Sequence, residues 1–127
     1  MRGDGTPARR HDAGGMAGGH DLPTPFELRL TPDRDRLVVA PRGELDIATA
    51  DQMNAALLEQ FDNGFAHVVA DLRDVTFIDS TGIRVLWHAH QRSERDGTRL
   101  SLIAGDGVVS RALQITGLLE HMDMLDR

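Results

Sequence analysis

An aspartate, a serine, a threonine and a glycine follow one another at residues 79–82, directly after an apolar stretch. The hydroxyl of Ser80 could carry a phosphoryl group. The N–H groups and the dipole of a helix N-terminus stabilise a phosphate by about 0.3 to 1 kcal/mol, and by about 2 kcal/mol where it is partly buried. Asp79 and Ser80 are equally residue types that cap helices. From the residue types alone, residues 79–82 fit a modification site and a simple helix cap.

Hydrolysis is another chemistry that a serine performs, and it requires a histidine base and an acid that orients it. The G-x-S-x-G sequence of a nucleophile elbow does not surround Ser80. The candidate bases are His67, His88, His90 and His121. We expect His90 to face the core and His88 to point elsewhere on the same helix. Because helical metal ligands are spaced three or four residues apart, this pair is also a poor metal site. We therefore expect neither a hydrolase nor a metal centre.

The composition argues against several further classes of site. The 127-residue chain has no cysteine, and its 14 basic residues are all arginine. Disulfides, thiolate nucleophiles, cysteine-bound metals, P-loops and Schiff bases are therefore excluded. A phosphoacceptor receiver domain, which also uses a lysine, is disfavoured. A formal net charge of −6 makes nucleic acid a poor partner. Since no G-x-G-x-x-G sequence occurs either, we expect no cofactor.

The chain is predicted to form one domain behind a disordered tail. Residues 1–24 are expected to be disordered. The first 20 residues hold six of the 13 glycines and almost no branched apolar residue, too little to offset the entropy of ordering. Residues 25–127 would form the folded domain. No segment approaches the roughly 20 apolar residues of a membrane helix, and the N-terminus lacks the apolar stretch of a signal peptide. A cytoplasmic protein without an inserted membrane segment is therefore expected.

Apolar periodicity predicts strands that alternate with helices. Strands are indicated at residues 26–30, 37–45, 67–72 and 99–104, with a last short one at 122–125. Helices are indicated from about 49 to 62, from 80 to about 95 and from 108 to about 116. The run at 67–72 is apolar almost throughout, as expected for a strand covered on both faces. Pro41 within its strand suggests an edge strand or a bulge.

Local signals mark the ends of the first two helices. Thr49 and Gln52 have the T-x-x-Q spacing of a capping box, and Asn63-Gly64 is a stop signal. In the second helix an apolar stripe recurs at the spacing of one helix face, and Asp96-Gly97 ends the helix. The stripe consists of Ile83, Leu86, Trp87 and His90. We expect it to face the core, with Trp87 partly buried.

Helices between successive strands indicate right-handed crossovers and a largely parallel sheet, which the first hairpin makes mixed. In open sheets of this kind, sites form outside the carboxyl ends of the strands. Residues 78–82 fall at such an end.

Three short sequences carry a resemblance to a known family. They are G-E-L-D at 43–46 followed by T-A at 49–50, D-L at 71–72 with F-I-D-S-T-G at 77–82, and T-G-L at 116–118. From about residue 26 to 125, the chain resembles the anti-sigma factor antagonist branch of the sulfate transporter and anti-sigma factor antagonist (STAS) domains. The resemblance implies a single α/β STAS-like domain, with a mixed, mostly parallel sheet of four to five strands and flanking helices.

The resemblance also implies a switch between partners. In such proteins a serine-kinase anti-sigma factor phosphorylates the serine that follows the aspartate, here Ser80. The unphosphorylated antagonist binds the anti-sigma factor and frees a sigma factor. The phosphorylated form is released until a serine phosphatase restores it, and no enzymatic activity of the antagonist is implied. The partner-binding surface would comprise Asp46, Asp79, Ser80, Thr81 and Gly82.

These residues also have structural alternatives. Asp46 is about equally suited to the partner-binding surface and to a structural role in a turn or helix cap, and Thr81 is suited to capping a helix or offering a second hydroxyl. Gly82 suits a close backbone approach or simply a first helical turn. At the level of function, the rival is a STAS domain that does not switch, serving as an adaptor subunit of a lipid-transport or stress-sensing complex.

Overall fold

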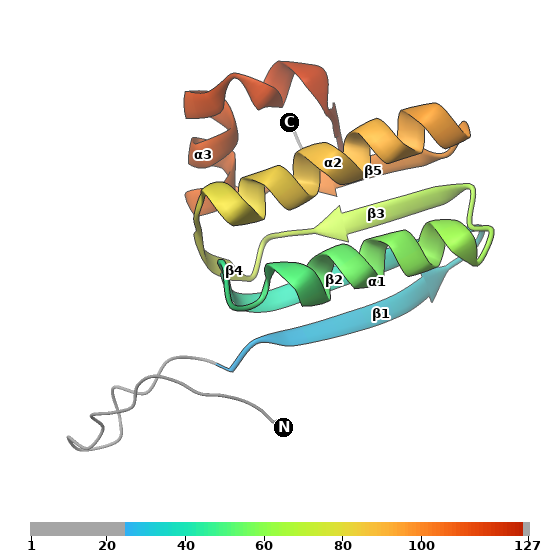
Figure 1. Ribbon diagram of the computed structural model, residues 1–127, viewed down its shortest axis with the longest axis horizontal. Coiled ribbons are helices and arrows are strands. Elements are labelled where there is room, and N and C mark those ends of the chain that lie inside the picture. Colours follow the sequence, from blue (N-terminus) through green and yellow to red (C-terminus); the bar gives the residue numbers. More distant parts are fainter. Residues whose placement is uncertain (1–24, 126–127) are drawn as a thin grey trace.

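The computed structural model describes residues 25–125, so the disordered tail predicted for residues 1–24 lies outside the described part. Within it, strands and helices alternate along the chain (Figure 1). The strands are β1 (Glu27–Asp33), β2 (Arg36–Leu45), β3 (His67–Asp71), β4 (Val75–Ile78), β5 (Arg99–Ile103) and β6 (Asp123–Met124). The helices are α1 (Ala50–Asp62), α2 (Ser80–Asp96), α3 (Val108–Thr116) and the 3-10 helix η1 (Leu118–His121). No helix of residues 25–125 has the length and apolar character needed to cross a membrane.

The strands form one mixed sheet in the order β1-β2-β3-β5-β6, and β4 pairs with the last residues of β2. β1 and β2 are antiparallel, and the other pairs are parallel. The mixed, mostly parallel sheet predicted from the sequence is therefore confirmed. It has six strands rather than four to five, because Val75–Ile78 forms a separate strand against β2.

β2 is an interior strand, although a proline stands in it. The edge position suggested by Pro41 is therefore wrong, and the irregularity lies two residues later, where the register between β2 and β4 shifts at Gly43/Glu44. β2 pairs with β3 through residues 36–39 and with β4 from residue 43 onward. Pro41 falls between these two ladders, so the N–H that proline lacks interrupts neither of them.

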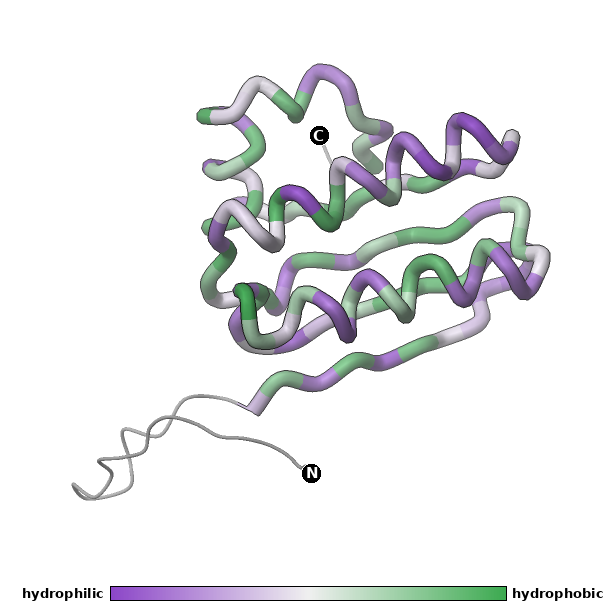
Figure 2. The backbone as a smooth tube through the Cα atoms, viewed as in Figure 1, coloured by the Kyte–Doolittle hydropathy of each residue, from purple (hydrophilic) through white to green (hydrophobic). Residues whose placement is uncertain are grey.

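The core lies between the sheet and the helices α1 and α2, which lie side by side across one face of it (Figure 1). β3 contributes Val68, Val69 and Ala70, all 0 % exposed, as predicted for a strand buried on both faces. Figure 2 shows hydrophobic and hydrophilic stretches alternating along both helices, as expected where one side of a helix packs on a sheet. Both helices begin at the carboxyl ends of strands, α1 after β2 and α2 after β4.

The start of α1 differs from the sequence prediction. The capping box expected from Thr49 and Gln52 is wrong, because no side-chain cap bond forms at this helix end. The Thr49 hydroxyl instead donates to the Glu44 carbonyl at 2.8 Å and accepts from the Asp46 N–H at 3.0 Å. The tight turn between β2 and α1 thus uses the threonine that would otherwise cap the helix.

α2 runs from Ser80 to Asp96 and ends before Gly97, as predicted. Gly97 has a φ of 73°, a conformation that glycine adopts readily. Its buried side is rotated from the predicted stripe. The buried residues are Gly82, Val85, Leu86, Ala89 and Ser93, whereas Ile83, Trp87 and His90 are half-buried. The larger side chains lie at the flank of the helix, where Trp87 stacks on His90 and meets the ring of His121 from η1. The partial burial expected of Trp87 is confirmed.

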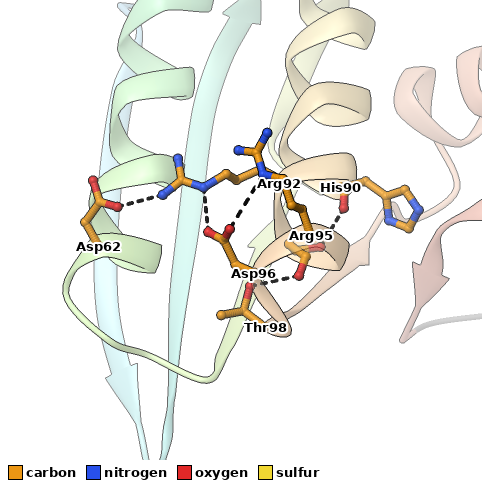
Figure 3. Close-up of polar contacts among 7 residues, drawn as sticks. Asp62, His90, Arg92, Arg95, Asp96 and Thr98 are labelled. Carbon is orange, nitrogen blue, oxygen red and sulfur yellow. Dashed lines mark hydrogen bonds and ion pairs between the residues drawn. The ribbon is translucent and has the colours of Figure 1, made fainter.

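An ion-pair cluster joins the C-terminal ends of α1 and α2 (Figure 3). Arg92 of α2 donates to Asp62 of α1 at 2.7 Å and to Asp96 of its own helix at 2.5 Å. Because these side chains are partly exposed, solvent screens each pair, and its contribution to stability is small. The cluster links the two helices at the ends farthest from their N-termini.

Candidate functional site

α2 begins at Ser80, directly after its N-cap residue Asp79. The Oδ1 atom of Asp79 accepts hydrogen bonds from the N–H groups of Thr81 at 2.9 Å and Gly82 at 3.0 Å. Asp79 is therefore the helix cap. Ser80 is exposed, and within residues 25–125 its side chain takes part in no hydrogen bond. A group added to its hydroxyl oxygen would break no bond of the described fold.

Gly82 brings α2 against the end of β2. A methyl group at this position would lie 2.7 Å from the carbonyl oxygen of Leu45 and 2.8 Å from Cγ1 of Ile78. The same Leu45 carbonyl accepts the N–H of Asp79 at 3.3 Å. The close backbone approach expected at Gly82 is confirmed, and it holds the start of α2 beside the end of β2.

Asp46 closes the turn that follows β2. Its Oδ1 atom accepts the N–H of Ala48 at 2.9 Å and lies 3.3 Å from the Thr49 hydroxyl. Asp46 is half-buried and directly follows Leu45, whose carbonyl contacts the start of α2. The turn-closing alternative is therefore observed, in the residue that follows the end of β2.

The structure thus gathers all the site residues predicted from the sequence at one place, where β2 and β4 end. The set consists of Asp46, Asp79, Ser80, Thr81 and Gly82. Ser80 is exposed, Asp46, Asp79 and Thr81 are half-buried, and Gly82 is buried. The exposed Ser80 hydroxyl, unbonded within the described fold, directly follows Asp79, and the hydrogen bonds of Asp79 and Asp46 hold the surrounding backbone.

Two exposed apolar side chains next to this set were missed by the sequence analysis. Ile47 is 80 % exposed in the turn after β2, and Phe77 is 48 % exposed on β4, two residues before Asp79. Phe77 is the register partner of Glu44, so both residues flank the paired ends of β2 and β4. The sequence signal that could have indicated this exposure is an isoleucine between Asp46 and Ala48, in the turn after β2. We call Ile47 and Phe77 the apolar border of the site.

One histidine contacts a serine hydroxyl, as a catalytic base would, but this serine is not Ser80. Nε2 of His67, on β3, is 2.8 Å from the hydroxyl of Ser101 on β5. Burial, and next the charge of Arg99, lower the pKa of His67. Among the hydrogen bonds of residues 25–125, none joins a histidine to Ser80. In the same part of the chain, no three metal-ligating side chains are grouped to hold an ion.

Comparison with known proteins supports the fold over nearly all of the described chain. The STAS domain family model matches residues 27–126. The anti-sigma F factor antagonist of Paenibacillus polymyxa is 26 % identical over 102 residues, which cover 80 % of this chain and 87 % of that relative.

Solved structures show the same architecture. An anti-sigma factor antagonist from Mycobacterium paratuberculosis is similar with a TM-score of 0.75 at 21 % identity, over 84 % of this chain and 92 % of that one. The phosphorylated form of the Bacillus cell fate determinant SpoIIAA is similar with a TM-score of 0.62 at 22 % identity, over 81 % and 91 % of the two chains. With a family match that spans every described strand and helix, the chain belongs to the STAS domain family.

Proposed function

We propose that this STAS domain is an anti-sigma factor antagonist. It binds an anti-sigma factor that is also a serine kinase, thereby releases a sigma factor, and is switched off when the kinase phosphorylates Ser80. The observation that carries the proposal is the exposed Ser80 hydroxyl, left unbonded in the described fold because Asp79 alone caps α2. The relative from Paenibacillus polymyxa bears the name of such an antagonist.

The proposed partner-binding surface surrounds this hydroxyl. It comprises Asp46, Asp79, Ser80, Thr81 and Gly82, bordered by Ile47 and Phe77. Exposed apolar side chains next to charged groups are typical of protein–protein interfaces, where apolar burial supplies affinity and charge supplies specificity. The partner therefore has apolar groups that cover Ile47 and Phe77.

Phosphorylation would weaken this contact by charge. The Ser80 oxygen forms a bond to the γ-phosphorus of ATP, the bond to ADP breaks, and the hydroxyl proton leaves to a base of the kinase. The product adds about −1.5 to −2 charges beside Asp79. A like-charge contact desolvated in an interface costs several kcal/mol, and ~3 kcal/mol lowers affinity about 150-fold. A serine phosphatase then restores the hydroxyl.

The proposal is tested by incubating the chain with ATP and each serine-kinase anti-sigma factor of its own cell, followed by intact-mass and phosphosite analysis. A single phosphate on Ser80 is expected, absent from Ser80→Ala and present in the neighbouring control Thr81→Ala. Phosphate on Thr81, or no transfer to Ser80 by any of these kinases, would contradict the switch. Stable binding of a transport or stress complex, unchanged by Ser80→Asp, would instead favour the adaptor role.

A further inference from the structure

An exposed arginine lies one helical turn after Ser80. Arg84 stands on the outward side of α2, opposite the buried residues Val85 and Ala89. Of the ten arginines in residues 25–125, five pair with aspartates and Arg84 is one of the five that do not; the paired ones are Arg36, Arg73, Arg92, Arg95 and Arg99. Arg84 forms no such ion pair with any acidic group of residues 25–125. Within this part of the chain, a cation is thus left without an acidic partner next to the hydroxyl.

The geometry of a helix directs this guanidinium toward Ser80. Residues four apart lie on the same side, with Cβ atoms about 5–6 Å apart. Side chains in a helix lean toward its N-terminus, so a side chain as long as that of Arg84 can reach the turn that contains Ser80. An acidic group four residues before a basic one is also the favourable order for a helical ion pair.

The nearby carboxylates are already engaged. Asp79 accepts two backbone N–H groups of α2, and Asp46 accepts the N–H of Ala48. A phosphate on Ser80 would add nearly two charges at the same place, and its oxygens match the planar donor fork of arginine. α2 thus carries an exposed acceptor hydroxyl and, four residues later, an arginine without an acidic partner in the described chain. A helix cap requires neither feature.

Building on the proposed function, we propose that Arg84 is the intramolecular counter-ion of phosphorylated Ser80. The guanidinium pairs with the phosphoryl oxygens along the outer side of α2 and stabilises the phosphorylated form of the chain. The partner then meets a phosphate that α2 of this chain already holds. Arg84 thus determines how stable the phosphorylated form is.

The test installs phosphoserine at position 80 during translation, so it requires no kinase. Phosphorus-31 NMR then follows the second ionisation of the phosphate in the full chain, whose ordinary pKa is about 6. With Arg84 present, this pKa should be lower than in Arg84→Gln by about 0.3 or more, as expected for an ion pair of this kind. The difference should shrink in about 1 M salt.

Matched variants separate a specific pair from a general charge effect. Arg95→Gln removes the same charge from the exposed side of the same helix, far from Ser80, and should behave like the parent. Arg84→Lys should retain most of the effect. Equal pKa values in the parent and Arg84→Gln, or an equal rise in Arg95→Gln, would overturn the proposal. Because no kinase takes part, this result is independent of whether an anti-sigma factor phosphorylates Ser80.

Discussion

The backbone N–H of Asp79 donates to the carbonyl oxygen of Leu45 at 3.3 Å, so the cap of α2 is bonded to the last residue of β2. That oxygen is also the atom nearest to the position of a Cβ on Gly82. Two contacts of α2 therefore converge on one backbone atom. The turn that carries Asp46 and the helix start that carries Ser80 cannot shift independently of one another.

Gly82→Ala should destabilise the chain by about 1–3 kcal/mol, since a methyl group 2.7 Å from the Leu45 carbonyl must displace backbone. Urea unfolding measures the loss. Gly107→Ala is the matched control, because Gly107 has a φ of −106° and a methyl group added there would have no atom within 4 Å. It should cost less than about 1 kcal/mol. Equal losses in the two variants would argue against the close approach at Gly82.

Asp79→Ala removes the side-chain cap of α2 and should lower the free energy of unfolding by about 0.5–2 kcal/mol. Asp79→Asn keeps an oxygen that can accept the N–H groups of Thr81 and Gly82, so it should remain within a few tenths of a kcal/mol of the parent. Thermal or urea unfolding distinguishes the two. If both substitutions were equally harmful, the carboxylate charge rather than the cap would be the stabilising feature.

Features set by a few neighbouring residues could be predicted from the sequence. The end of α2 before Gly97 depends on one backbone conformation that glycine adopts readily, and the cap at Asp79 depends on N–H groups two and three residues away. The alternation of strands and helices follows from apolar periodicity in the same local way. These signals were enough to place Ser80 at a helix start outside a strand end.

Features set by distant partners could not be predicted in this way. Pro41 is tolerated in an interior strand because β2 changes neighbours around it, from β3 to β4. Thr49 fails to cap α1 because its hydroxyl bonds back to Glu44 in the preceding strand. The exposure of Ile47 likewise depends on how the turn after β2 lies against the rest of the fold, which no local pattern encodes.

Ile47→Ser should weaken binding of the anti-sigma factor about tenfold or more while leaving stability nearly unchanged, because the side chain is 80 % exposed. Isothermal titration calorimetry with the purified partner measures the affinity. Ile115→Ser is a matched control, since Ile115 is similarly exposed, at 77 %, on α3 and is not one of the residues of the proposed partner-binding surface. An equal loss of affinity in both variants would contradict the apolar border as the contact.

Because of His67, we expect the free energy of unfolding to fall in mild acid. Its pKa is lowered from 6.5 by burial, and next by Arg99 and Arg36, although Asp123 and Asp35 act in the opposite direction. Protons therefore bind His67 more readily in the unfolded chain than in the folded chain. The contribution of His67 to the free energy of unfolding is complete above about pH 6.5, and it is lost as the pH falls through the lower pKa of the folded chain.

The free energy of unfolding, measured by urea titration between about pH 7.5 and 5, should fall less steeply in His67→Gln than in the parent. His88→Gln, which removes an exposed histidine of α2, is the matched control. An unchanged slope in His67→Gln would show that another group causes the acid sensitivity.

Charge at Ser80 should decide partner affinity without a change of fold. Ser80→Ala should bind the anti-sigma factor as tightly as the unphosphorylated parent, because the hydroxyl forms no hydrogen bond within the described fold. Ser80→Asp adds one negative charge beside Asp79 and should weaken binding by about tenfold, less than a phosphate with nearly two charges. Ser80→Asn matches the aspartate in size but is neutral, so it separates charge from shape. If Ser80→Asn bound as weakly as Ser80→Asp in calorimetry, steric exclusion rather than electrostatic repulsion would operate the switch.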